Sequence, residues 1–155
     1  MPCSGDSLIY VLARNILGCS VLRYSPAGAL IGSTDLDIYL EGNSNALDVD
    51  QEGNAVFGGA HGNQFNIAKV SPTGTVLWNH DFSFPGLSAA SSYITNVVCD
   101  ASGNIYAAGS AGNLQYGLLT AFSPSGQQNW VDTTEASYVI SYQARNKDRL
   151  LLHDD

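Results

Sequence analysis

The three histidines, His61, His80 and His153, are the first candidates for chemistry in this chain. Histidine binds metals and transfers protons near neutral pH, but a metal site needs several ligands to converge. His61 and His80 could approach each other across one end of a structural unit, with Asp81 beside them. The competing interpretation is that all three are hydrated loop residues. We favour that interpretation, so neither a metal nor another cofactor is predicted.

Motifs for catalysis are also missing. No Gly-x-Ser-x-Gly segment occurs that would present a nucleophilic serine. Residues 48–53 match the start of a calcium loop superficially, but Gly59 stands where the bidentate glutamate is expected. Glycoside hydrolysis by the retaining route needs two carboxylates about 5 Å apart. The sequence does not place Asp37, Asp81 or Asp132 that finely, so no catalytic residue is assigned.

The composition of the 155 residues narrows the class of protein further. Apolar residues make up 45% and charged residues 13%, which is enough to build a core in one domain. The net charge of −8 includes only six basic residues, so a surface for nucleic acid is not expected. No apolar run reaches the roughly 20 residues that span a membrane. The cysteines, Cys3, Cys19 and Cys99, are odd in number and widely spaced, which argues against a disulfide framework.

Two repeated turn motifs show how the chain must position its side chains. Ser25-Pro26-Ala27-Gly28 recurs as Ser71-Pro72-Thr73-Gly74 and as Ser123-Pro124-Ser125-Gly126. An Asp-x-x-Gly-Asn motif precedes the second and the third of these, at residues 50–54 and 100–104. Proline, glycine, aspartate and asparagine each favour a turn for a separate physical reason. The turn residues so predicted are Asp50, Gly53, Asn54, Pro72, Gly74, Asp100, Gly103, Asn104, Pro124 and Gly126.

The segments between the turns predict strands. They are runs of about four to eight residues bounded by Gly, Pro, Asn or Asp, and none has the apolar spacing of a helix. One unit therefore contains four antiparallel strands, a to d, with Asp-x-x-Gly-Asn between a and b and Ser-Pro-x-Gly between c and d. Repeated units of this kind are typical of a β-propeller. Trp78 and Trp130, both on strand d, are predicted to fill the space between blades.

The register of the repeats predicts an all-β fold, a single partial propeller over residues 1–155 with about three and a half blades. Blade 1, about residues 5–36, would contain strands b, c and d. Blades 2 and 3, about residues 46–83 and 95–133, would be complete, and residues 138–155 would begin a fourth blade with strands a and b. Propellers have about four blades or more. Three explanations stay open: a piece of a longer chain, a homodimer that closes a six-bladed ring, or an open arc held by a partner protein.

Residues 53–59 and 65–78 resemble the SBBP-type bacterial β-propeller repeat. They carry a Gly-Asn opening, an aromatic-aliphatic-Ala-Lys strand, a Pro-x-Gly turn and a strand that ends in tryptophan. Residues 103–130 are similar but have Thr-Ala in place of Ala-Lys. More distantly, the Thr-Gly-x-x-x-Trp element resembles repeats of pyrroloquinoline-quinone-dependent dehydrogenases, whose adjacent cysteine pair is absent here. The resemblance implies a propeller, an extracellular or cell-surface location, and no particular reaction.

Any ligand site is expected at the end of the blades opposite the repeated turns, in the loops between strands b and c and between d and a. Variable loops on a rigid scaffold are a common arrangement for binding. We therefore predict a non-catalytic scaffold that binds a protein or a carbohydrate. The alternative is a fragment of a propeller enzyme, quinone-dependent or polysaccharide-active, with its catalytic residues on other blades. The candidate ligand-binding residues are His61, Asn63, His80, Asp81, Phe84, Asn113 and Gln115.

Overall fold

Antiparallel β-sheets make up the whole of the regular structure in the part of the chain that is described. The computed structural model describes residues 7–39, 46–62, 64–83, 93–111, 116–134, 142–145 and 149–152, the last two segments as backbone only. These residues form thirteen strands and no helix. The predicted all-β fold, with its succession of three, four, four and two strands, is confirmed.

The strands form four separate sheets, which we call blades 1 to 4, and within each sheet they lie in chain order. Blade 1 contains β1 (Ile9–Asn15), β2 (Gly18–Tyr24) and β3 (Leu30–Leu36). Blade 2 contains β4 (Leu47–Val49), β5 (Ala55–His61), β6 (Gln64–Val70) and β7 (Val76–Phe82). Blade 3 contains β8 (Tyr93–Cys99), β9 (Ile105–Ala111), β10 (Tyr116–Phe122) and β11 (Gln128–Thr134). Blade 4 is the pair β12 (Tyr142–Arg145) and β13 (Arg149–Leu152).

Blade 4 has the two strands that the sequence predicted. The first of them was expected over residues 138–142, and β12 is described over Tyr142–Arg145. Residues 135–141 lie outside the described part of the chain. No Asp-x-x-Gly-Asn turn marks the end of this strand, so the local signal that fixed strand a in blades 2 and 3 was missing here.

The Asp-x-x-Gly-Asn turn is closed by its own side chains. In blade 2, the Asp50 carboxylate accepts hydrogen bonds from the backbone N–H groups of Glu52 (3.0 Å) and Asn54 (2.9 Å). Gly53 has φ +81°, a left-handed conformation that glycine adopts without steric cost. The same bonds recur in blade 3 around Asp100. The turn is therefore specified locally, which is why its sequence pattern predicts it.

The blades stack face to face, and two apolar cores lie between them. Cys19, Val21, Phe57 and Val70 are among the buried residues between blades 1 and 2. A second cluster, with residues from β5, β6, β8, β9 and β10, fills the space between blades 2 and 3. Strands β5 and β6 are thus covered on both faces, which accounts for their long apolar runs.

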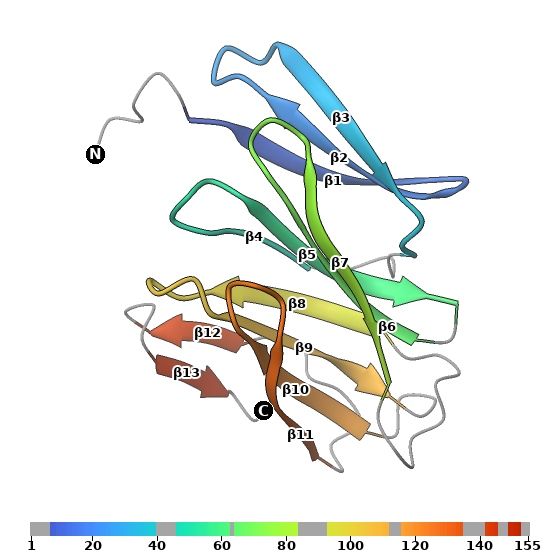
Figure 1. Ribbon diagram of the computed structural model, residues 1–155, viewed down its shortest axis with the longest axis vertical. Coiled ribbons are helices and arrows are strands. Elements are labelled where there is room, and N and C mark those ends of the chain that lie inside the picture. The colour runs from blue at the N-terminus through green and yellow to red at the C-terminus, as the bar shows by residue number, and fades with distance from the viewer. Residues whose placement is uncertain are drawn as a thin grey trace.

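Figure 1 shows the three larger blades one after another, in chain order. Strands β4, β8 and β12, the first strands of successive blades, contact one another in turn. Strands β7 and β11 lie at the opposite edges of their sheets and are largely exposed. Successive blades that meet along their first strands are arranged as in a propeller. None of the described residues forms a helix that could cross a membrane.

Candidate functional site

The repeated turns occupy one end of the sheets, as the alternation of strand direction predicts. A Cβ atom at Gly53 would lie 3.4 Å from Cγ of Pro72, and one at Gly103 would lie 3.3 Å from Cγ of Pro124. The two turns of each complete blade are therefore in contact. The loops between strands b and c lie at the opposite end. There, polar side chains gather on blades 1 and 2.

Blade 1 carries a short chain of hydrogen bonds at this end. The Asn15 side-chain amide donates to Ser20 Oγ (2.8 Å), and the Ser20 hydroxyl donates to Asp35 Oδ1 (2.6 Å). The three residues come from β1, β2 and β3 in turn. Ser20 and Asp35 are direct cross-strand partners, so the pairing of the strands brings them together.

Blade 2 has a larger network at the equivalent positions, where His61, Asn66 and Asp81 replace the three polar residues of blade 1. Nδ1 of His61 lies 2.9 Å from Asp81 Oδ2. The Asn66 side-chain amide donates to Asp81 Oδ1 and to Asn79 Oδ1, each at 2.6 Å. Asn66 is only 1% exposed, and its side-chain oxygen Oδ1 is buried without a hydrogen-bond partner among the described residues. The Asp81 carboxylate is thus held in place by both of its oxygens.

Asp37 connects the two blades. It follows β3, and its Oδ2 lies 3.6 Å from Nε2 of His61. The chain is fixed at this point because Tyr39 forms a two-way backbone bridge with Ala60: Tyr39 N–H donates at 2.6 Å and Ala60 N–H at 2.8 Å. The imidazole of His61 therefore lies between carboxylates of blades 1 and 2.

The electrostatics of this group favour a charged histidine. The hydrogen bond and the negative charge of Asp81 raise the pKa of His61, with a further contribution from Asp37. Partial burial opposes ionisation of Asp81, but the donors Asn66 and His61 outweigh it and lower the pKa of that carboxyl. A histidine oriented by a carboxylate can serve as a general base. Within the described residues, however, no serine, threonine or cysteine is hydrogen-bonded to His61.

A cleft of about 430 Å³ lies beside this network, at the same end of blade 1. Its rim includes two aliphatic side chains of the turn between β1 and β2: Ile16 is 97% exposed and Leu17 is 76% exposed. Asn15 holds the turn, because its side-chain oxygen Oδ1 accepts a hydrogen bond from Leu17 N–H (2.8 Å). The cleft is lined by Asn15, Ile16, Leu17, Asp35, Leu36, Asp37 and Tyr39.

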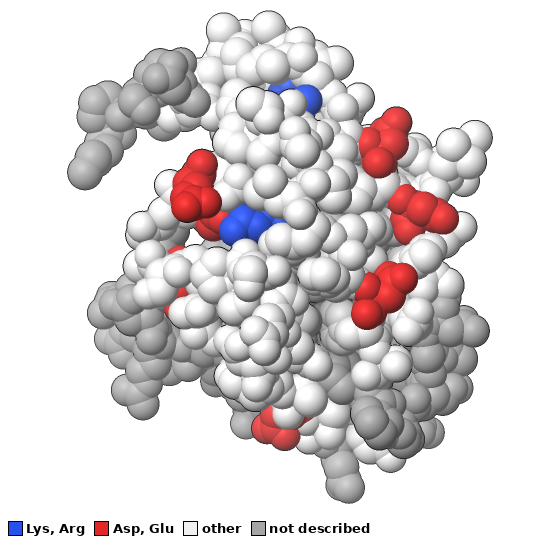
Figure 2. Space-filling model, viewed as in Figure 1, with Lys and Arg blue, Asp and Glu red and all other residues white. Residues whose placement is uncertain are grey.

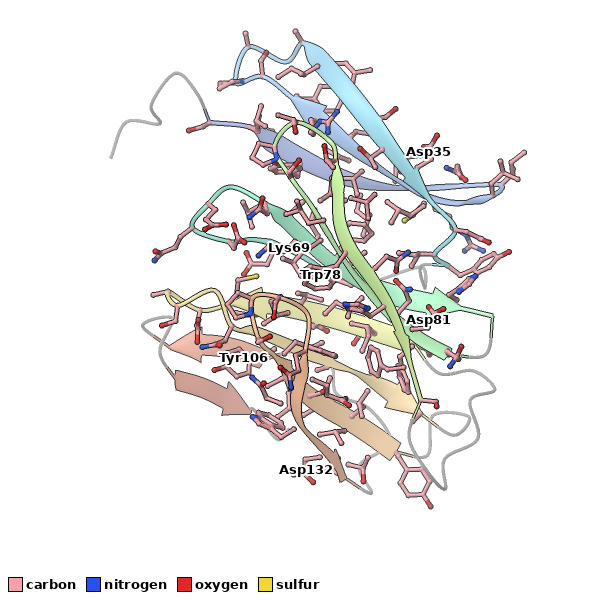
Figure 3. All side chains as sticks on the ribbon, viewed as in Figure 1. Asp35, Lys69, Trp78, Asp81, Tyr106 and Asp132 are labelled. Carbon is pink, nitrogen blue, oxygen red and sulfur yellow. The ribbon has the colours of Figure 1, made fainter. Side chains whose placement is uncertain are left out.

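The cleft lies on an acidic side of the molecule. Figure 3 shows Asp35 on β3 and Asp81 on β7 along the same side. Figure 2 shows acidic side chains that follow one another down this side, with no Lys or Arg among them. Tyr39, which is half exposed, adds an aromatic surface to the cleft. The site therefore combines apolar surface with hydrogen-bond acceptors that carry negative charge.

The structure brings together only some of the residues that the sequence predicted for the site. His61 and Asp81 are brought together, whereas His80 is not part of their group: its ring stacks on Trp78, with centroids 5.4 Å apart. His80 and Asp81 are neighbours on β7, so their side chains leave opposite faces of the sheet. Within the described part of the chain, no group of His, Cys, Asp and Glu is arranged to hold a metal ion. The other predicted residues, Asn63, Phe84, Asn113 and Gln115, lie outside the described residues.

Sequence reasoning missed most of the cleft. Ile16, Leu17 and Tyr39 were not among the predicted ligand-binding residues, and neither was the buried Asn66. An alignment of the repeats could have found the polar positions, since blade 3 has the less polar set Ala111, Leu118 and Thr133 where blades 1 and 2 have hydrogen-bonded networks. No comparable signal in the sequence marks the cleft itself.

Comparison with known proteins supports the fold and leaves the family open. No protein-family model matches the sequence, and neither does any curated protein. The fold is similar to that of a quinonprotein alcohol dehydrogenase-like protein from Bacteroides thetaiotaomicron, with a TM-score of 0.57 and 13% sequence identity. The similarity covers 85% of this chain and 32% of the other chain. This chain therefore has a propeller-type fold and spans about a third of that neighbour.

Proposed function

We propose that this chain is a non-catalytic binding module, and that it binds a protein segment in the cleft at the loop end of blade 1. The observation that carries the proposal is the pair of aliphatic side chains, Ile16 and Leu17, exposed on the rim of a cleft that also contains carboxylates. Apolar side chains that are exposed beside polar groups are typical of sites where proteins meet.

The charge of the site favours a basic partner. Asp35 and Asp37 line the cleft, and Asp81 lies next to it through His61. The whole chain has a net charge of −8. A partner segment with an apolar anchor flanked by Lys or Arg would match both features, because complementary charge steers association and apolar burial supplies affinity.

Binding to immobilised peptides of defined sequence tests this proposal. We expect peptides with an aliphatic or aromatic anchor and flanking basic residues to bind, and the same peptides with acidic flanks not to bind. The variant Ile16→Ser/Leu17→Ser should lose about tenfold or more in affinity, as truncation of an interface anchor does. The variant Leu30→Ser/Ile31→Ser is the matched control, since it removes two exposed apolar side chains from the other end of blade 1.

An oligosaccharide array in parallel separates the two partner classes. Binding to sugars, with no binding to basic peptides, would contradict a protein partner and favour a carbohydrate ligand. Retention of full peptide affinity by Ile16→Ser/Leu17→Ser would show that the cleft is not the site. Asp37→Asn should mainly reduce the association rate and its dependence on salt, because Asp37 is an exposed charge at the rim.

A propeller enzyme with catalytic residues on further blades is the second candidate. It is favoured by the fold similarity to the quinonprotein alcohol dehydrogenase-like protein, of which this chain covers 32%. Among the described residues, no group of three or more His, Cys, Asp and Glu is arranged to hold a metal ion. A melting-temperature shift on addition of pyrroloquinoline quinone and Ca²⁺ would favour the enzyme, because a ligand of the folded state must stabilise it.

The SBBP resemblance adds an extracellular or cell-surface location to the proposal. Detection of the native protein in the culture medium or on intact cells, by an antibody raised against this chain, would support that location. Detection only after the cells are lysed would contradict it.

A further inference from the structure

Asp37 belongs to the cleft of blade 1 and to the polar network of blade 2 at the same time. It is part of the lining of the cleft, and its Oδ2 lies 3.6 Å from Nε2 of His61. The Asp37 side chain is 68% exposed, so a cation that enters the cleft can reach it. The imidazole of His61 and a cation bound in the cleft would therefore share one carboxylate.

The backbone around Asp37 is fixed, so its short distance to His61 is built into the fold. Its two neighbours in the chain are buried. Two residues after Asp37, Tyr39 forms the two-way backbone bridge with Ala60, the residue directly before His61. Gly59 permits this close approach, because a side chain there would collide with the Tyr39 carbonyl oxygen. The connection from blade 1 is thus held against the end of β5.

The His61 ring is oriented from its other side by Asp81. Nδ1 lies 2.9 Å from Asp81 Oδ2, and the buried Asn66 amide donates to the second oxygen of that carboxylate at 2.6 Å. A carboxylate only accepts hydrogen bonds, so neutral His61 donates its Nδ1–H to Asp81. The proton that His61 gains on acidification then goes to Nε2, the ring nitrogen that faces Asp37.

Two charged groups among the described residues act on His61. They are Asp81 from β7 and Asp37 from the connection after β3. Its cross-strand neighbour on β6, Gln64, is neutral, and the ring of His80 lies on the opposite face of β7. Protonation of His61 therefore reduces the net charge of this group from that of two carboxylates to that of one.

We propose that His61 regulates the cleft by competing for Asp37: neutral His61 leaves this carboxylate to a basic group of the partner, and protonated His61 takes it. The inference rests on the proposed function, since it concerns the regulation of the same site. Affinity for a basic segment then rises as His61 loses its proton and falls on acidification. Asp35, which accepts a hydrogen bond from Ser20 within blade 1, supplies attraction that does not depend on His61.

The pH range of the effect follows from the surroundings of His61. The hydrogen bond and the charge of Asp81, with a contribution from Asp37, raise the pKa of His61 above 6.5. A cation bound at Asp37 opposes protonation, so the pKa of His61 is lower in the complex than in the free chain. By linkage, the affinity changes between these two pKa values, and by the factor that separates them. Pairs of exposed charges predict a factor of about two to five.

Peptide binding to the chain at about pH 5.5 and about pH 8.5, in low salt, tests the proposal. The probe is an acetylated and amidated peptide with one leucine flanked by lysines and without histidine, so it does not titrate in this range. We expect the dissociation constant to be about two- to fivefold higher at the lower pH. In an NMR titration, saturation with the peptide should lower the pKa of His61 by the corresponding amount.

Matched variants assign the effect to His61. His61→Gln should remove the pH dependence, whereas His80→Gln should keep it, because the His80 ring stacks on Trp78 and is not part of the network. Asp81→Asn should move the change in affinity to lower pH, since Asp81 is the main cause of the raised pKa of His61. Far-UV circular dichroism at both pH values checks that every variant is folded.

The outcomes separate this regulation from binding itself. Equal affinity of the unmodified chain at both pH values would overturn the proposal and leave peptide binding in the cleft standing. Dependence on pH that survives His61→Gln, or that His80→Gln removes equally, would overturn it too. No binding of the peptide at either pH would contradict the proposed function, and the regulation with it.

Discussion

The ion pair between Lys69 and Asp50 offers a direct test of what stabilises the junction between blades 2 and 3. Lys69 Nζ lies 2.7 Å from Asp50 Oδ2, and the two side chains are only 6% and 3% exposed. The change to make is Lys69→Met, which keeps the unbranched apolar stem and removes the charge. It leaves the Asp50 carboxylate buried without its counter-ion and takes one donor from the Pro124 carbonyl.

The expected cost can be worked out from the remaining partners of Asp50. Removal of one member of a buried ion pair costs about 3–5 kcal/mol. The backbone N–H groups of Glu52 and Asn54 and the Asn54 side-chain amide still donate to the carboxylate. We therefore expect the lower end, about 3 kcal/mol in the free energy of unfolding. For a chain of this size that corresponds to a melting temperature about 6–12 °C lower.

Blade 3 shows that the turn itself does not need the lysine. Asp100 makes the same backbone hydrogen bonds, from Ser102 N–H and Asn104 N–H (2.8 Å each), although Ala121 stands in the position of Lys69. The loss in Lys69→Met can therefore be attributed to the unpaired charge and the lost contact with blade 3, and not to collapse of the turn. The double variant Asp50→Asn/Lys69→Met, which removes both charges, should recover much of the stability.

Urea unfolding at several pH values is the assay. Burial opposes ionisation of Asp50, but the Lys69 and Asn54 donors and the lysine charge outweigh it and lower the pKa of the carboxyl. The stability so gained is present above the ordinary pKa of aspartate and is lost as the pH falls through the lowered pKa. The difference between the unmodified chain and Lys69→Met should therefore be largest at neutral pH and shrink below about pH 4. Equal stability at neutral pH, or a difference that grows on acidification, would refute the reasoning.

Three further predictions concern single residues. Because Asp81 raises the pKa of His61, an NMR titration should place it above the ordinary value of 6.5, and Asp81→Asn should bring it down. The stability that the His61–Asp81 pair contributes is present below the ordinary pKa of histidine and is lost as the pH rises through the raised pKa of His61. A His61 pKa at its ordinary value would contradict the pairing. Gly58→Ala should cost about 1–3 kcal/mol in urea unfolding, since its Cβ would lie 2.5 Å from Ile94 Cγ2, and an unchanged midpoint would show that the blades can move apart. Burial raises the pKa of the Cys19 thiol to about 11. In a variant whose other cysteines are replaced by serine, Cys19 should therefore react with a thiol reagent at pH 8 only after the chain unfolds. Rapid reaction of the folded chain would disprove the burial of Cys19.

The fold could be predicted because its signals are local. Each Asp-x-x-Gly-Asn turn is closed by hydrogen bonds that reach no further than four residues, as from Asn54 to Asp50. Each Ser-Pro-x-Gly turn is closed in the same way: Gly74 N–H donates to the Ser71 carbonyl at 2.9 Å. Once the turns are fixed, the strands between them have only one antiparallel order. The number and succession of strands follow from the turns.

The candidate site could be predicted only in part, because its contacts are not local. His61 and Asp81 lie on strands of one blade, and the sequence suggested only that His61 and His80 could approach each other with Asp81 beside them. Asp37 reaches His61 from another blade, through a connection whose path is set by the bridge between Tyr39 and Ala60. No turn motif specifies that path. The cleft depends on it, since Asp37 and Tyr39 are both part of its lining.

The two ends of the blades therefore have separate roles. At the turn end, both described junctions place the backbone of a turn on side chains of the preceding blade. Thr34 donates to the Gly74 carbonyl in one, and Lys69 and Trp78 donate to the Pro124 carbonyl in the other. At the other end, blades 1 and 2 carry polar networks, whereas blade 3 has apolar Ala111 and Leu118 at the equivalent positions. The contacts at the turn end fix the spacing of the blades, so the residues at the opposite end can vary without destabilising the packing between blades. Substitutions at the turn end should accordingly change stability, and those around the cleft should change binding.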